Sequence, residues 1–116
     1  MESRRRWKKG AARVALALGL VVMLDARAGS DQGVTIQTFQ FKPTPVEVPA
    51  GTKVSFTNQD DITHTITSGT PDSPDGRFSH RLEGKGSTAS VELGKPGVYP
   101  YFCERHRSMR GEIRVK

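Results

Sequence analysis

Residues 46–58 read Val46-Glu-Val-Pro-Ala-Gly-Thr-Lys-Val-Ser-Phe-Thr-Asn58: two short runs with apolar residues at alternate positions, separated by the turn-forming residues 49–52. Successive side chains of a β-strand point to opposite faces, so this spacing predicts two short strands that each bury one face. The proline and glycine between the runs favour a change of chain direction. The stretch therefore indicates a protein built from short strands and tight turns.

The same pattern continues on both sides of this stretch. Alternating apolar and polar residues predict strands at residues 34–41 and 87–93, and in the second of these Ala89, Val91 and Leu93 should face inward. Residues 68–77 are turn-formers and are expected to form a loop too long for a tight hairpin. Further short strands are predicted at residues 64–67, 78–82, 98–102 and 112–115. Seven or eight strands without an amphipathic helix predict an all-β fold, a Greek-key β-sandwich.

The first 28 residues differ in composition from the rest. They carry seven Lys or Arg residues and two acidic ones, whereas the remainder carries eleven basic and ten acidic residues. An apolar run at residues 14–24 follows the basic cluster, and Ala26-Arg-Ala28 is a small-x-small cleavage site. The run is too short to span a bilayer, which needs about 20 residues. Residues 1–28 are thus predicted to be an export signal, and residues 3–9 look like a twin-arginine motif.

The predicted signal leaves a flexible segment at residues 29–33 and a domain at residues 34–116. The formal charge of +6 belongs mostly to the signal, so it is no argument for binding nucleic acid. Removing 28 of the 116 residues leaves 88, with one cysteine, Cys103. A single cysteine cannot form an internal disulfide. In an exported protein it indicates an intermolecular bridge, a free thiol or a metal ligand.

Cys103 lies in the segment Cys103-Glu-Arg-His-Arg-Ser-Met109, which also holds an imidazole and a thioether. Thiolate, imidazole and a weak axial thioether are ligands of copper electron-transfer sites, which also need a second imidazole. The other histidines are His64, at a predicted strand start after a polar turn, and His80, among exposed residue types; His64 is the preferred ligand. The neighbouring Asp60 and Asp61 are expected to be solvated, because two carboxylates do not supply the oxygens of a calcium site.

Together with the strand framework, these segments resemble the cupredoxins, the small blue-copper proteins, and most closely the amicyanin and plastocyanin group. The resemblance covers residues 34–116 and is carried by residues 39–41, 46–58, 64 and 97–111. It implies one type 1 copper ion bound by His64, Cys103, His106 and Met109, with His106 near the surface as the electron port. The chain departs from the pattern in two places: Thr65 stands where cupredoxins often have Asn, and the ligand loop lacks proline.

The sequence thus predicts an exported, periplasmic copper protein that carries single electrons between redox-protein partners. It is expected to be a monomer, not an enzyme, with no stable membrane insertion after cleavage. Arg105, Arg107 and Arg110 crowd the ligand loop and are candidate residues for docking a partner. A copper chaperone or scavenger is the alternative, although Met-rich or His-rich tracts are missing. Three histidines are too few for a copper oxidase or nitrite reductase, and methionine is a poor zinc ligand.

Overall fold

The computed structural model describes residues 31–116, so the predicted export signal lies outside the described residues. Within this range the chain forms strands and turns, and it contains no helix long and apolar enough to cross a membrane. The strands are β1 (Asp31–Gln37), β2 (Gln40–Lys42), β3 (Val46–Val48), β4 (Lys53–Asn58), β5 (His64–Thr70), β6 (Ser73–Leu82), β7 (Thr88–Glu92), β8 (Gly97–Phe102) and β9 (Arg110–Val115).

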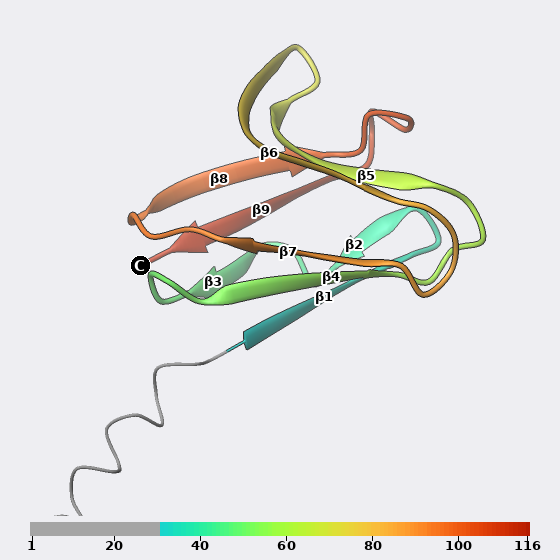
Figure 1. Cartoon of the computed structure of the whole chain (residues 1–116). Helices are drawn as coiled ribbons and strands as arrows, with labels where there is room; N and C mark the ends of the chain where they lie inside the picture. Colours follow the sequence, from blue (N-terminus) through green and yellow to red (C-terminus); the bar gives the residue numbers. More distant parts are fainter. Residues whose placement is uncertain (1–30) are drawn as a thin grey trace, which may run out of the picture. The chain divides into compact units, whose positions relative to one another are not determined.

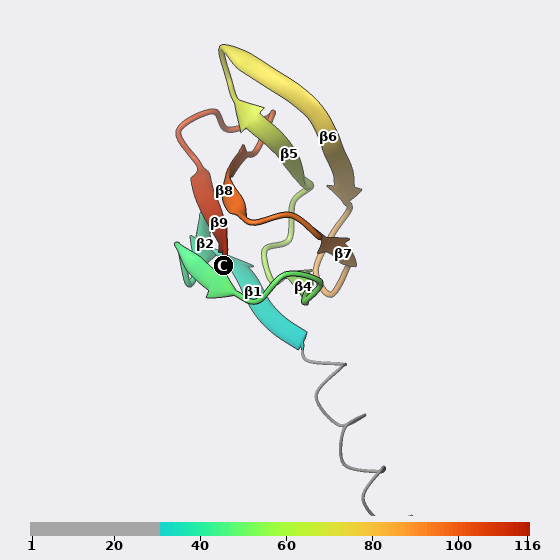
Figure 2. The ribbon, with the colours of Figure 1, turned by 90° about the vertical axis from the view of Figure 1, so that its left-hand side faces the viewer.

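The strands form two sheets that pack face to face (Figures 1 and 2). One sheet has the order β2-β1-β4-β7 and the other the order β3-β9-β8-β5-β6. The pairs β1–β4 and β3–β9 are parallel, and the others are antiparallel. Neighbours in each sheet are often distant in sequence, so the chain crosses repeatedly between the layers. The predicted all-β sandwich is confirmed.

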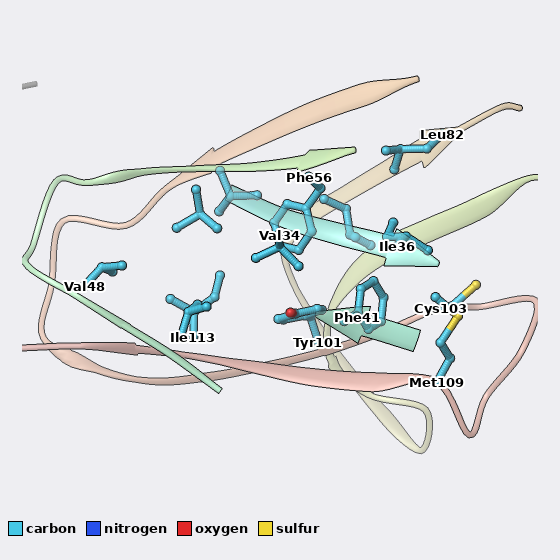
Figure 3. Close-up of a cluster of buried hydrophobic side chains, with 14 of the residues drawn as sticks. Val34, Ile36, Phe41, Val48, Phe56, Leu82, Tyr101, Cys103, Met109 and Ile113 are labelled. Carbon is cyan, nitrogen blue, oxygen red and sulfur yellow. The ribbon is translucent and has the colours of Figure 1, made fainter. Parts of the chain in front are cut away.

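The core lies between the two sheets and is filled by the apolar members of the alternating runs (Figure 3). Val54 and Phe56 of β4 are buried, whereas Lys53 is exposed, as the alternation predicted. Phe41, Phe56 and Tyr101 meet edge to face, with ring centroids 4.7 to 6.3 Å apart. Such aromatic contacts contribute about 0.5–1.5 kcal/mol beyond the burial of their area. The sandwich is therefore tightly packed on the side that leads to Cys103.

The prediction of one strand at residues 34–41 was wrong in one respect, because the structure divides this segment between β1 and β2. Gln37 pairs with Gln40, so Thr38 and Phe39 form a two-residue hairpin turn. Both have left-handed φ angles, 55° and 59°, which only hairpin turns of the primed type require at two successive positions. Threonine and phenylalanine are poor residues for this conformation. The sequence gives no local sign of the turn, because its support comes from Asp60, 22 residues away from Thr38.

The loop predicted at residues 68–77 was also wrong. Only Pro71 and Asp72 connect β5 to β6, which form a tight hairpin with Thr70 opposite Ser73. The register shifts between Thr67 and Gly69, whose φ of 102° suits glycine, and the pairing then continues from Gly69 and Pro74 up to the turn. The turn-forming residues 68–77 therefore form a bulge and part of the edge strand β6 as well as a turn.

Gly111 should not tolerate a side chain. A Cβ at this position would overlap the ring of Tyr101, which is buried and held by Phe41 and Phe56. We expect Gly111→Ala to lower the free energy of unfolding by about 1–3 kcal/mol. Gly33→Ala is the matched control, because a Cβ there meets nothing within 4 Å, and its effect should stay within about 0.5 kcal/mol. Urea unfolding of the metal-free variants measures both, and equal midpoints would contradict the packing described.

Candidate metal centre

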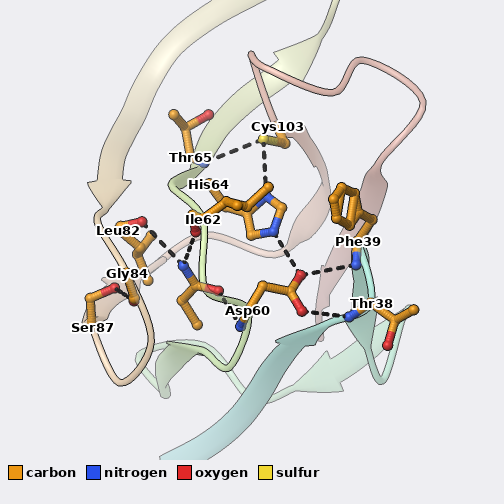
Figure 4. Close-up of polar contacts among 11 residues, drawn as sticks. Thr38, Phe39, Asp60, Ile62, His64, Thr65, Leu82, Gly84, Ser87 and Cys103 are labelled. Carbon is orange, nitrogen blue, oxygen red and sulfur yellow. Dashed lines mark hydrogen bonds and ion pairs between the residues drawn. The ribbon is translucent and has the colours of Figure 1, made fainter.

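The start of β5 and the loop between β8 and β9, which carry the predicted ligands, meet at one end of the sandwich (Figure 1), and Figure 4 shows two of these ligands, His64 and Cys103. His64 begins β5, Cys103 directly follows β8, and Met109 directly precedes β9. Residues 103–109 form the loop that joins β8 to β9, and His106 lies in its middle. The turn between β1 and β2 approaches the same end. The structure thus brings together all four predicted ligands, whereas His80 is exposed on the edge strand β6.

His64 and Cys103 form the buried centre of this cluster. Both are fully buried, and Cys103 Sγ lies 3.7 Å from His64 Nδ1 (Figure 4). The other ring nitrogen, His64 Nε2, lies 2.8 Å from Asp60 Oδ2. A carboxylate can only accept a hydrogen bond, so Nε2 carries a proton, and in the neutral ring the lone pair is on Nδ1, which faces the sulfur. This is the arrangement in which an imidazole serves as a metal ligand.

Asp60 was expected to be solvated, and this was wrong. Its side chain is only 14% exposed; Oδ1 accepts the Thr38 N–H at 2.8 Å, and Oδ2 accepts the Phe39 N–H at 3.0 Å as well as the His64 proton. Burial alone would raise the pKa of Asp60, but the hydrogen bonds from Phe39, Thr38 and His64 outweigh it and lower the pKa below its usual value. Asp61, in contrast, is exposed as expected.

The strain in the β1–β2 turn is offset at Asp60. A left-handed conformation costs roughly 1–2 kcal/mol for a residue with a side chain. Hydrogen bonds to a charged group are worth about 1.5–3 kcal/mol each, and the carboxylate accepts one from each of the two strained residues, Thr38 and Phe39. Asn58 Oδ1 in turn accepts the Asp60 N–H at 2.9 Å, and Asn58 Nδ2 donates to the Ile62 and Leu82 carbonyl groups. Asp60 is therefore held through both its carboxylate and its backbone N–H.

His106 is half-buried, and its ring is covered by an aromatic side chain. The Phe39 ring centroid lies 4.8 Å from that of His106 and 5.4 Å from that of His64, and the two imidazole centroids are 5.4 Å apart. Within the described part of the chain, His106 Nε2 is buried without a hydrogen-bond partner. Phe39 itself is 46% exposed. A buried ring nitrogen without a hydrogen-bond partner is rare because its burial costs free energy. Binding of a metal ion by the ring is one way to offset that cost.

Met109 lies beside Cys103 at the end of the core (Figure 3). Its side chain is 4% exposed, its carbonyl group accepts the Cys103 N–H at 3.0 Å, and its own N–H donates to the His106 carbonyl at 2.8 Å. These two backbone hydrogen bonds close the ligand loop. They supply a constraint that the missing prolines would otherwise give.

Thr65 joins β5 to the ligand loop. Its backbone N–H donates to Cys103 Sγ at 3.4 Å (Figure 4). Its hydroxyl oxygen accepts the Glu104 N–H at 2.8 Å. The threonine therefore makes the bridge to the cysteine loop at the position where cupredoxins often have Asn.

The donor set fits copper. Thiolate, two imidazoles and a thioether are the soft and borderline ligands that copper prefers, and they suit calcium or magnesium poorly. In residues 31–116 no three His, Cys, Asp or Glu side chains already surround one point closely enough to hold a metal ion. The preformed part is the pair His64 and Cys103, and the ring centroid of His106 lies 5.4 Å from that of His64.

Comparisons with known proteins agree with this chemistry. Residues 28–116 match the family described as copper binding proteins, plastocyanin/azurin family. The chain is 31% identical over 99 residues to plastocyanin A/B of Petroselinum crispum, covering 78% of this chain and 98% of that protein. It is 30% identical over 106 residues to amicyanin-alpha of Methylorubrum extorquens, covering 90% of this chain and 88% of that protein.

The fold has solved counterparts as well. A structure titled as a novel purple cupredoxin from Nitrosopumilus maritimus superposes with a TM-score of 0.68 at 26% identity, over 74% of this chain and all of that one. An amicyanin from Paracoccus versutus gives a TM-score of 0.64 at 22% identity, over 74% of this chain and 81% of that one. The chain belongs to the plastocyanin/azurin family of copper-binding proteins, that is, to the cupredoxins. Its cofactor is one type 1 copper ion, and in general terms it is a copper electron-transfer protein.

Removing the Thr65 hydroxyl should loosen the ligand loop. Thr65→Val keeps the shape of the side chain but leaves the Glu104 N–H without its acceptor. We expect a loss of about 1 kcal/mol in the free energy of unfolding and faster hydrogen exchange at the Glu104 amide. Thr65→Ser, which retains the hydroxyl, is the control and should protect that amide like the wild type. NMR hydrogen exchange on the metal-free protein decides this, and equal exchange in both variants would contradict the bridge.

Proposed function

We propose that this chain is an exported type 1 copper protein that carries single electrons between redox-protein partners. His64, Cys103, His106 and Met109 are the proposed ligands. The observation that carries the proposal is the buried pair of Cys103 Sγ and His64 Nδ1, 3.7 Å apart, with the other ring nitrogen of His64 held by Asp60. This pair presents a sulfur and a nitrogen donor to one point before any metal binds.

The protein's part in electron transfer is to keep these donors in place. Copper supplies the one-electron change between its two oxidation states. The thiol must be deprotonated and the imidazoles neutral for binding. The Thr65 N–H points at the sulfur, and the Asp60 carboxylate holds the Nε2 proton of His64, which leaves Nδ1 of the neutral ring as the donor. Strands β5 and β8 and the two backbone hydrogen bonds of the ligand loop hold the donors where they are. Little structural change then accompanies the gain or loss of an electron.

Export and a periplasmic location are part of the proposal. The composition of residues 1–28 supports them, and the family match begins at residue 28, next to the predicted cleavage site. The compact unit Asp31–Lys116 supports a separate domain from about residue 34 to residue 116. That this domain acts as a monomer is also part of the proposal.

Substitutions at Cys103 and His64 should test two of the four ligand assignments spectroscopically. With Cu(II), the wild type should show an intense visible band from thiolate-to-copper charge transfer. Cys103→Ser should abolish the band, because the thiolate produces it. His64→Ala should alter the band and recover it with added imidazole, which fills the open position. His80→Ala is the control and should leave the spectrum unchanged.

Visible and EPR spectra of the copper-loaded variants measure these effects. A band that survives Cys103→Ser would exclude the proposed centre. Loss of the band in His80→Ala, with no effect of His64→Ala, would transfer the ligand role to His80. A wild type that binds copper without any thiolate band would favour the chaperone or scavenger alternative.

Three arginines around the ligand loop are the proposed docking residues for an acidic partner. Arg107 donates to the Pro71 carbonyl at 2.9 Å and lies 3.6 Å from the Asp72 carboxylate, so its charge is partly compensated. Arg110 Nε donates to the Arg107 carbonyl at 3.2 Å. Arg105 is exposed and makes no ion pair with the other described residues. Arg105, Arg107 and Arg110 together form a positive rim beside the proposed copper centre.

Reversing two of these charges should change electron-transfer rates with small charged reagents. For Arg105→Glu/Arg110→Glu we expect slower reduction by hexacyanoferrate(II), an anion, and faster reaction with cationic cobalt phenanthroline complexes. The wild-type rate with the anion should fall as salt is added, because screening is strong beyond about 8–10 Å at physiological ionic strength. Stopped-flow kinetics across a salt series measures these rates.

The control for this experiment changes the total charge by the same amount at the other end of the sandwich. Lys53 begins β4 and Lys95 precedes β8, and both are exposed. Lys53→Glu/Lys95→Glu should therefore have a much smaller effect on both reagents. Equal effects of the two double variants would show that net charge, and not the positive rim, controls the rates.

A further inference from the structure

Asp60 links two features that lie far apart in the sequence: the ring of His64 and the strained turn of Thr38 and Phe39. One oxygen, Oδ2, accepts both the His64 ring proton and the Phe39 N–H, and Oδ1 accepts the Thr38 N–H (Figure 4). All three contacts are between 2.8 and 3.0 Å. A displacement of this carboxylate would therefore act on the imidazole and on the turn at the same time.

The turn is important for the site because it carries Phe39. It places the Phe39 ring against both imidazoles, with its centroid 4.8 Å from that of His106 and 5.4 Å from that of His64. Phe39 remains 46% exposed, so it lies between the two rings and the solvent. In an ordinary strand, which the alternation of residues 34–41 predicts, Phe39 would not turn back in this way. The left-handed backbone at residues 38 and 39 is thus coupled to the cover over the site.

We propose that Asp60 is a positioning residue of the copper centre, which fixes the His64 ring and the Phe39 cover as one unit. The proposal rests on the proposed function, because it takes His64 and His106 as ligands. Asp60 does not bind the metal itself. It orients the Nδ1 lone pair of His64 toward Cys103, as outer carboxylates do for other metal-bound histidines, and it keeps Phe39 over the imidazoles so that water and chelators reach the metal slowly.

Two readouts follow, one of which needs no metal. In the metal-free protein, the ring nitrogens of His64 should show a single tautomer protonated at Nε2, and Asp60→Ala should produce a mixture of tautomers. In the copper-loaded protein, Asp60→Ala should speed extraction of copper by a chelator about 10- to 100-fold and shift the thiolate band. Asp61→Ala is the matched control, since Asp61 is the adjacent carboxylate and is exposed.

Further variants separate the two contacts of the carboxylate. Asp60→Asn keeps one oxygen and therefore some of the hydrogen bonds, so it should fold even where Asp60→Ala does not and should show intermediate extraction rates. Thr38→Gly relieves the left-handed strain, and in the Asp60→Ala background it should restore contacts between Phe39 and His106 in NMR spectra. It should not restore the single His64 tautomer, because the imidazole still lacks its acceptor.

The possible results are distinct. Wild-type tautomers and extraction rates in both Asp60 variants would overturn the proposal, and so would full recovery of slow extraction in Asp60→Ala/Thr38→Gly, which would leave Asp60 as a support for the turn alone. A wild type without a thiolate band would overturn the proposed function instead. The tautomer measurement on the metal-free protein then still shows whether Asp60 orients His64.

Discussion

The antiparallel pairing of β5 with β8 determines where the thiol of this protein lies. Thr67 pairs with Phe102 and Ser68 with Tyr101, so the chain leaves β8 at Cys103 beside the start of β5. Because strand side chains alternate between faces, a slip of one residue would turn Tyr101 out of the core and Cys103 away from His64. Packing of Tyr101 against Phe41 and Phe56 opposes such a slip. The aromatic core therefore acts on the metal centre through strand register.

A second constraint is that buried polar groups need hydrogen-bond partners. Several such groups lie at the end of the sandwich that holds His64 and Cys103. Asn58, His64, Thr65 and Cys103 are all buried there, and each needs a partner. Asn58 holds the β4–β5 connection and the Asp60 backbone, Asp60 holds His64, and Thr65 holds Cys103 and Glu104. These bonds join three separate segments of the chain. The ligand loop needs less internal stiffness as a result, which accounts for a loop without proline.

Sequence alone predicted the parts that depend on local patterns. Period-two alternation located the strands around Val54, Phe56 and Val91, and the unusual grouping of Cys103, His106 and Met109 indicated copper. It missed the features that depend on distant contacts. The Thr38–Phe39 turn looks like strand because its support is the distant carboxylate of Asp60. Asp60 looks solvated because its partners lie in that turn and at the start of β5. An acidic residue four positions before a predicted histidine ligand was the available signal.

The β5–β6 hairpin was missed for a different reason. Glycine and proline near residues 69–76 indicate a change of direction, but a propensity argument cannot tell one tight turn with a bulge from a long loop. Ser68 decides it here, because its hydroxyl group accepts the Phe78 N–H and donates to the Phe78 carbonyl across the two strands. That pairing is visible only once the strands are placed.

The contacts of the single cysteine distinguish among its three possible roles: an intermolecular bridge, a free thiol or a metal ligand. An intermolecular disulfide requires access, and Cys103 is fully buried behind the ligand loop. An inert buried thiol would be expected among apolar neighbours, whereas this sulfur accepts an amide N–H and lies 3.7 Å from an imidazole nitrogen whose proton is held on the far side of the ring. A sulfur and a nitrogen donor thus lie next to each other in the core. Of the three roles, a metal ligand is the one that uses the contacts the fold provides.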